Sequence, residues 1–159
     1  MIVTDRLTLL PLRVEHAEKM AEVLSGPALY TFTGGEPPTV AELETRYQRQ
    51  LAGPNGPDEQ WLNWVIQYDD ALVGYVQATV ADGTAEIAWV IGSAWQGRGF
   101  AKEAAQGLVT WLRAQYIGQI VAHIHPEHAA SAAVATAIGL ARTDVLMDGE
   151  YLWSTAGPV

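Results

Sequence analysis

The chain contains no cysteine, which excludes a disulfide framework and every mechanism that uses a thiol nucleophile. Basic residues are also few: 9 Lys and Arg stand against 18 Asp and Glu, and the formal net charge is -9. A nucleic-acid-binding protein normally presents a basic face, so this balance argues against a nucleic-acid partner and slightly favours cationic or amine-bearing substrates.

Long hydrophobic runs are missing as well. No apolar run approaches the roughly 20 residues that span a bilayer, and no basic segment precedes an apolar stretch at the N-terminus. We therefore expect no membrane partner and a cytoplasmic location. The chain does contain 49% hydrophobic residues in a length of 159, enough for a single domain, residues 1–159, with its own core.

Hydropathy patterns and turn signals divide the chain into strands and helices. Strands are predicted at 6–12, 61–68, 72–80, 84–91, 119–124, 140–147 and 150–154. Helices are predicted at 13–24, 39–51, 100–116 and 128–138, the second of them opened by a capping box of Thr39 and Glu42. The strands between 61 and 91 read as an antiparallel meander, and the whole order indicates a mixed α/β fold of the α+β type.

The segment from Ala85 to Gly107 is the centre of the functional prediction. It runs from a β-prone strand through the turn 96–99 into a helix that begins near Phe100. A glycine-rich turn at a helix N-terminus is an anion site, because free backbone N–H groups and the positive end of the helix dipole meet there. We therefore expect a ligand that carries phosphate.

Three kinds of phosphate-binding loop compete for this segment. A P-loop is excluded, because Arg98 replaces the Lys that must follow the second glycine, and no hydroxyl residue comes after it. A dinucleotide loop fails, because Lys102 stands at its third glycine and a meander precedes the loop in place of a βαβ unit. The third candidate ligand is acyl-coenzyme A: Gln96, Gly99 and Ala101 make Gln-x-x-Gly-x-Ala, which resembles the pyrophosphate-binding motif of the GNAT superfamily of N-acyltransferases.

The resemblance covers nearly the whole chain. The opening Thr-Asp-Arg-Leu-Thr-Leu-Leu-Pro-Leu, the Ala-Ser-Ala-Ala-Val segment before Ile-Gly-Leu, and the terminal Asp-Gly-Glu-Tyr resemble the branch of ribosomal-protein N-terminal alanine acetyltransferases, which includes many non-ribosomal acetylases. The GNAT resemblance implies a mixed, mostly antiparallel sheet of about seven strands with about four helices. It also implies that strands 84–91 and 119–124 splay apart to hold acetyl-coenzyme A as the cosubstrate.

The resemblance also assigns the contacts to coenzyme A by position. Pantetheine would bind the free backbone groups of Trp89, Val90 and Ile91. The pyrophosphate would bind residues of the loop and helix start, namely Gln96, Gly97, Arg98, Gly99, Phe100, Ala101 and Lys102. Arg98 adds a charge suited to phosphate oxygens. His128 stands where relatives carry the Asn that contacts pantetheine, and Ser131 matches a family serine near the sulfur.

Catalysis needs a base for the amine proton and a proton for the leaving thiolate. Glu86 is the candidate base, because burial on its otherwise apolar strand would raise its pKa and several relatives place a carboxylate there. The alternative is a Glu that pairs with a neighbouring cation or only orients the substrate. Ala135 stands where many relatives carry a Tyr, so another residue must protonate the leaving thiolate or hydrogen-bond to the sulfur. Ser131 is the first candidate for this role and Tyr151 is the second.

Two further predictions concern the surroundings of the reacting atoms. The residues at 123, 125 and 128 form His-x-His-x-x-His, but no Cys and no carboxylate except Glu127 completes this metal-like spacing. We therefore expect no metal and a titrating His at the groove. The acceptor site is expected to use Glu86 and a wall of aromatic residues, namely Tyr30, Phe32, Trp64 and Trp153.

Together these patterns predict an acetyl-coenzyme A-dependent N-acetyltransferase that acts on a primary amine by direct attack in a ternary complex. The acceptor is left open between a protein N-terminus, an aminoglycoside or polyamine, and an amino-acid-like compound. The alternative, which Ala135 and His128 make conceivable, is a catalytically degenerate GNAT module that binds or senses acyl-coenzyme A. Exposed C-terminal strands add the expectation of a homodimer.

Overall fold

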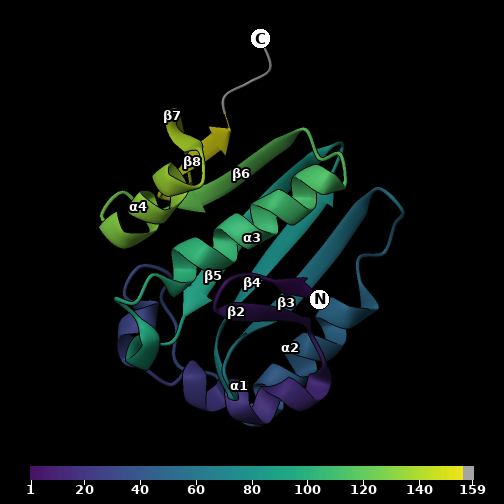
Figure 1. Cartoon of the computed structure of the whole chain (residues 1–159), viewed down its shortest axis with the longest axis vertical. Coiled ribbons are helices and arrows are strands. Elements are labelled where there is room, and N and C mark those ends of the chain that lie inside the picture. Colours follow the sequence, from purple (N-terminus) through teal and green to yellow (C-terminus); the bar gives the residue numbers. More distant parts are fainter. Residues whose placement is uncertain (156–159) are drawn as a thin grey trace.

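The computed structural model describes residues 1–155 (Figure 1). The strands are β1 (Ile2–Val3), β2 (Leu7–Pro11), β3 (Glu59–Tyr68), β4 (Ala71–Ala81), β5 (Thr84–Ile91), β6 (Gln119–Ile124), β7 (Leu140–Met147) and β8 (Glu150–Thr155). The α-helices are α1 (Ala17–Val23), α2 (Val40–Ala52), α3 (Phe100–Ala114) and α4 (Ala129–Ala137), and short 3-10 turns lie at Val14–His16, Pro27–Tyr30 and Ser93–Trp95. Residues 156–159, which the predicted domain includes, lie outside the described part, and the single domain stays a prediction.

The strands form one eight-stranded sheet in the order β1-β2-β3-β4-β5-β6-β8-β7. Within residues 1–155, each neighbouring pair is antiparallel except β5 and β6, which are parallel. The predicted α+β fold with a mixed, mostly antiparallel sheet is therefore confirmed. The count of about seven strands misses β1, whose 2 residues are too few to show an alternating pattern.

Helices cover both faces of the sheet (Figure 1). On one face α3 buries an apolar stripe made of Phe100, Ala104, Ala105, Leu108, Val109 and Leu112. On the other face α1 and α2 pack against a second core that includes Met20, Leu43 and Val65. The predicted capping box at the start of α2 is present, with Thr39 Oγ1 accepting the N–H of Glu42 and Glu42 Oε1 accepting that of Thr39, both at 3.1 Å.

Alternation along β5 decides which of its side chains meet a ligand. Ala85 and Ile87 are buried in the core beneath α3, so Glu86 and Val90 project from the opposite face. Val90 packs against the core of α1 and α2, whereas the side chain of Glu86 is 49% exposed. The helices therefore leave the part of this face around Glu86 open.

No helix within residues 1–155 is long and apolar enough to cross a membrane. The cytoplasmic location stays a prediction. β7 forms one edge of the sheet and exposes Val145, Leu146 and Met147. The homodimer expected from these C-terminal strands also stays a prediction.

Candidate active site

β5 and β6 separate shortly after they begin. Their parallel pairing starts at Thr84 and ends where Glu86 lies opposite Val121, although β5 continues to Ile91 and β6 to Ile124. The splaying of these two strands, expected from the sequence, is therefore confirmed. Beyond the last pair, the inner edge of β5 offers unpaired backbone N–H and C=O groups to anything that enters the gap.

A groove of about 770 Å³ opens between the separated strands, a volume typical of small-molecule sites. It is lined by β4, β5, β6, the loop before α3, the first turns of α3 and α4, and part of segment 28–33. Most residues predicted to bind coenzyme A line it: Trp89, Val90, Ile91, Gln96, Gly97, Gly99, Phe100, Ala101, Lys102, His128 and Ser131. The structure thus brings the predicted strand, loop and helix α4 contacts to one groove.

The loop before α3 presents backbone donors to this groove. Gly97 and Gly99 have φ angles of 79° and 80°, and Gly99 is the N-cap of α3 in the left-handed conformation. Gln96 Nε2 donates a hydrogen bond of 2.9 Å to the carbonyl oxygen of Ile91, which ties the loop to the end of β5. Within residues 1–155, the N–H groups of Gly97, Arg98 and Gly99 donate no hydrogen bond to the protein. Free N–H groups at a helix N-terminus are suited to pyrophosphate, so these residues fit coenzyme A.

Arg98 does not line the groove in this structure, and its predicted contact with phosphate stays a prediction. Its guanidinium carbon lies 5.0 Å from the ring centroids of Tyr68 and Phe100 and 5.7 Å from that of Trp95. Its Nη2 is 3.4 Å from the Tyr68 hydroxyl oxygen. These cation–π contacts hold the guanidinium against the three rings. Lys102 lines the groove and supplies a cation there.

Glu86 and His123 meet across the point where β5 and β6 part. Both line the groove, and the Glu86 carboxylate contacts His123 Nδ1. The side chain of Glu86 is 49% exposed and that of His123 is 26% exposed. The burial that we expected for Glu86 on an apolar strand is therefore wrong, because alternation turns this residue away from the core. The observed contact of Glu86 is with the imidazole of His123, and both its role as base and the alternative of pairing with a neighbouring cation stay predictions.

The three histidines of the predicted metal-like spacing take part in two different contacts. His123 pairs with Glu86, whereas the rings of His125 and His128 lie 4.9 Å and 4.7 Å from the ring of Phe32. Within residues 1–155, no group of three or more His, Cys, Asp or Glu side chains could hold a metal ion. Burial lowers the pKa of His128, and nearby His125 lowers it further. Phe32, predicted to wall the acceptor site, lines the groove through this contact.

Helix α4 places Ser131 on the groove and Ala135 in the core. Ser131 and Val134 line the groove, one helical turn apart, while Ala135 is fully buried against the other core residues. Tyr151, the second candidate for the thiolate, does not line the groove. Its ring lies 4.3 Å from the guanidinium carbon of Arg142. Ser131 is therefore the better placed of the two candidates.

Three of the four aromatic residues predicted to wall the acceptor site lie elsewhere. Trp64 is 6% exposed and packs edge-on against Trp111 of α3, because its position on β3 points to the α3 face. Trp153 faces the same core, opposite Ala122 on β6. Tyr30 uses its hydroxyl to donate a hydrogen bond of 2.7 Å to the carbonyl oxygen of Leu24. Without a known sheet register, the sequence could not tell which face the rings of Trp64 and Trp153 occupy.

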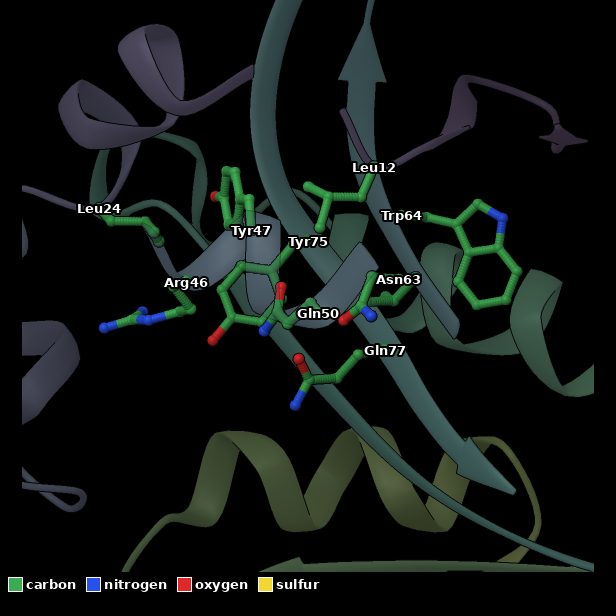
Figure 2. A pocket seen from close by; sticks show the side chains of 10 residues that line it. Leu12, Leu24, Arg46, Tyr47, Gln50, Asn63, Trp64, Tyr75 and Gln77 are labelled. Atoms are coloured by element: carbon green, nitrogen blue, oxygen red, sulfur yellow. The ribbon is translucent and has the colours of Figure 1, made fainter. Parts of the chain in front are cut away.

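A row of polar residues on β4 was not singled out from the sequence. Tyr75, Gln77 and Thr79 alternate along β4 and line the groove on the face that carries Glu86. Tyr75 and Gln77 also line a small adjoining pocket of about 30 Å³ beneath α2, where Gln50 and Asn63 lie beside them and Trp64 turns away (Figure 2). Burial raises the pKa of Tyr75, so its hydroxyl stays neutral. The alternation of polar residues along 75–79 is the sequence signal that could have identified this row as lining a groove.

Solved structures of other proteins share this fold. The fold matches an acetyltransferase of the GNAT family from Bacillus anthracis, with 21% identity, 96% of each chain covered and a TM-score of 0.80. It also matches the microcin C7 self-immunity acetyltransferase MccE in complex with acetyl-CoA and AMP (18% identity, 95% of this chain and 92% of that chain, TM-score 0.79). A third match is the ribosomal L7/L12 α-N-protein acetyltransferase RimL in complex with coenzyme A (18% identity, 98% and 96% covered, TM-score 0.77).

Sequence comparison gives the family. No curated protein sequence matches the chain. The sequence model of the acetyltransferase (GNAT) domain matches residues 6–141, a range that spans the loop before α3, the β5–β6 gap and helix α4. With the splayed strands and the amide-lined loop in place, this match shows that the chain belongs to the GNAT acetyltransferase family.

Proposed function

We propose that this protein transfers the acetyl group of acetyl-coenzyme A to a primary amine, with both substrates bound at the same time. The observation that carries the proposal is the unpaired gap between β5 and β6, which leads directly to the amide-lined N-terminus of α3. An extended pantetheine arm fits the edge of a strand, and a pyrophosphate fits a helix N-terminus. Acetyl-CoA and coenzyme A bound to MccE and RimL support the same assignment.

In the proposed reaction, the amine nitrogen attacks the thioester carbonyl carbon, a C–N bond forms and the C–S bond breaks. A neutral amine loses one proton as the amide forms and the leaving thiolate gains one, so the protein needs a group for each transfer; an amine that arrives protonated first releases its extra proton to water. Ser131, on the groove face of α4, is proposed to hydrogen-bond to the sulfur or protonate it. Because a thiol has a pKa of about 8.5, the thiolate leaves without a strong acid and Ser131 assists only modestly.

The amine proton is proposed to pass to the pair formed by Glu86 and His123. A carboxylate that accepts Nδ1–H fixes the neutral imidazole as the tautomer whose Nε2 is a proton acceptor. Both side chains lie on the open face of the sheet beside the gap, so an amine that approaches the thioester from that face meets them. Glu86, the base proposed from the sequence, then acts directly or through His123.

The acceptor is proposed to be an amine of modest size or the N-terminus of a protein. Solved structures with this fold include a spermidine N-acetyltransferase chimera, an aminoglycoside acetyltransferase and RimL. The carboxylates of Glu86 and Glu150 line the groove, and the chain carries a formal charge of -9. Both features favour a protonated amine over an anion as the approaching substrate.

A thiol-release assay across a panel of amines tests the proposal. The panel contains a polyamine, an aminoglycoside, free amino acids and short peptides with a free N-terminus, each offered with acetyl-coenzyme A. We expect thiol release above background with at least one amine class, and a mass increase of one acetyl group on that amine. Tight acetyl-coenzyme A binding without release for any amine would instead identify a module that binds acyl-coenzyme A without turnover.

A further inference from the structure

The turn between β1 and β2 lies directly against helix α3. A Cβ atom added to Gly107 would lie 2.7 Å from Cγ2 of Thr4, a distance that real Cβ atoms do not tolerate. Glycine at this position therefore lets the turn approach the helix closely. As a result, Thr4 and Arg6 come within reach of the first turn of α3, although about a hundred residues separate them in the chain.

Glu103, in the first turn of α3, is held by both residues. Its Oε2 accepts hydrogen bonds from Thr4 Oγ1 at 2.5 Å and from the backbone N–H of Arg6 at 2.8 Å. Its Oε1 accepts a hydrogen bond from Arg6 Nε at 2.7 Å. Burial alone would raise the pKa of Glu103, but these bonds outweigh it and hold the pKa below its ordinary value. The carboxylate is thus a fixed anion that anchors the Arg6 side chain.

The other end of the Arg6 guanidinium reaches the loop before α3. Nη1 donates a hydrogen bond of 2.9 Å to the carbonyl oxygen of Arg98, and the guanidinium carbon lies 4.8 Å from the ring centroid of Phe100. In a planar trans peptide, the C=O of Arg98 and the N–H of Gly99 point in opposite directions. By holding this carbonyl on its own side, Arg6 turns the N–H of Gly99 the other way.

The geometry points to Arg6 as a positioning residue for the pyrophosphate of coenzyme A, an inference that rests on the proposed function. Arg6 does not line the groove, whereas Gly99 does. Arg6 therefore acts through the Arg98–Gly99 peptide and keeps the loop amides aimed at the ligand. Glu103 fixes the Arg6 guanidinium, and the hydrogen bond from Thr4 fixes Glu103 in turn. The Thr-Asp-Arg segment at the start of the chain therefore helps to position the loop before α3.

The test compares Arg6→Met with the wild-type protein in binding two thioesters. Met keeps an unbranched apolar stem over Phe100 but donates no hydrogen bond. We expect the dissociation constant for acetyl-coenzyme A to rise about 10- to 100-fold, as for the loss of a charge-assisted hydrogen bond, with kcat at saturation within about twofold. The KM for S-acetyl-pantetheine, which lacks the pyrophosphate, stays unchanged in the variant.

Arg113→Met is the matched control, because it removes the same charge from an exposed position in the last turn of α3. It tests whether the loss of one positive charge alone weakens binding of an anion, and we expect no change in affinity. Thr4→Val removes the hydrogen bond from Thr4 to Glu103 while it keeps the shape of the side chain, and we expect the affinity for acetyl-coenzyme A to fall a few-fold. This second variant decides the matter if Arg6→Met does not fold by circular dichroism.

Each outcome separates the positioning role from the proposed function. Unchanged acetyl-coenzyme A affinity in Arg6→Met, or in Thr4→Val if the first variant unfolds, overturns the role of Arg6 and leaves the acetyltransferase proposal standing. Equal losses for acetyl-coenzyme A and S-acetyl-pantetheine overturn it too, because a general collapse of the groove would then explain the result. Absence of acetyl-coenzyme A binding in the wild-type protein refutes the proposed function itself.

Discussion

Replacing the two members of the Glu86–His123 pair gives the most informative prediction for the chemistry. Glu86→Gln and His123→Gln each remove one titrating group and the contact that joins Glu86 to His123 Nδ1. If the pair accepts the amine proton as a unit, each single variant loses nearly the whole catalytic benefit. The double variant Glu86→Gln/His123→Gln should then be no slower than the slower single variant.

The expected loss of kcat/KM in each single variant follows from the exposure of the two side chains. General-base catalysis contributes about 10²- to 10⁴-fold, and a hydrogen bond to a charged group is worth about 1.5–3 kcal/mol. Glu86 is 49% exposed and His123 is 26% exposed, so water replaces part of what is lost and screens the charge. We therefore expect kcat/KM for the amine to fall about 10²-fold in each single variant, near the lower end of the range.

The assay is initial-rate thiol release as a function of pH, with the acetyl-coenzyme A affinity measured separately by titration calorimetry. Glu44→Gln serves as the control, because Glu44 is exposed on α2 and does not line the groove. The acidic limb of kcat/KM should change in both pair variants and stay the same in the control. If the losses in the two single variants multiply in the double variant, or if neither variant slows the reaction, the pair is not the proton acceptor.

Three further variants test the cofactor loop, a titrating contact and the core. Gly99→Glu should abolish acetyl-coenzyme A binding in calorimetry, because Gly99 has a φ of 80° that a residue with a side chain rarely adopts, and its added Cβ would lie 3.3 Å from Nη2 of Arg6, so the loop that carries the free amides is distorted; binding as tight as in the wild type would contradict the pyrophosphate assignment. The pKa of His128 lies below its ordinary value of 6.5, so as pH falls below 6.5 the unfolded chain takes up a proton at this residue before the folded protein does, and the folded protein loses stability. The urea midpoints measured at pH 7.5 and 5.5 should therefore differ less in His128→Gln than in the wild type. Equal differences in the two proteins would refute the contribution of His128. Leu108→Ala should lower the free energy of unfolding by about 2–5 kcal/mol, because Leu108 is 0% exposed, whereas the exposed Thr110→Ala should change it by less than about 0.5 kcal/mol; similar effects of the two would contradict the core assignment.

The sequence allowed most of the fold to be predicted, because its signals are local. Turn signals at Asp82 and Gly83 and the alternation that follows place a strand at 84–91, as observed in β5. The helix stripe that includes Leu108 likewise predicts which side of α3 is buried. Strand β1 was missed because its pairing with β2 depends on tertiary contact and not on its own two residues.

The cofactor part of the candidate site was predictable for the same reason. The loop and the start of α3 are contiguous in sequence, so a motif of glycines and a helix start describes the backbone geometry. The side chain of Arg98 is the exception, because it packs over the rings of Tyr68, Trp95 and Phe100, and two of these rings lie outside the motif.

The catalytic and acceptor residues depend on sheet register, which no local pattern contains. A shift of one residue would move Trp64 from the α3 face to the groove face. The contact between Glu86 and His123 likewise exists only because β5 and β6 align as parallel neighbours before they part. Arg6 approaches the loop through the turn against Gly107, a contact that becomes visible only once the fold is known.

Calorimetric titration of the wild-type protein with acetyl-coenzyme A, with S-acetyl-pantetheine titrated in parallel, tests the central claim most directly. The gap between β5 and β6 and the amides before α3 predict a micromolar dissociation constant for acetyl-coenzyme A and much weaker binding of the thioester without the pyrophosphate. No heat of binding at millimolar acetyl-coenzyme A, or equal affinity for the two thioesters, would contradict the account.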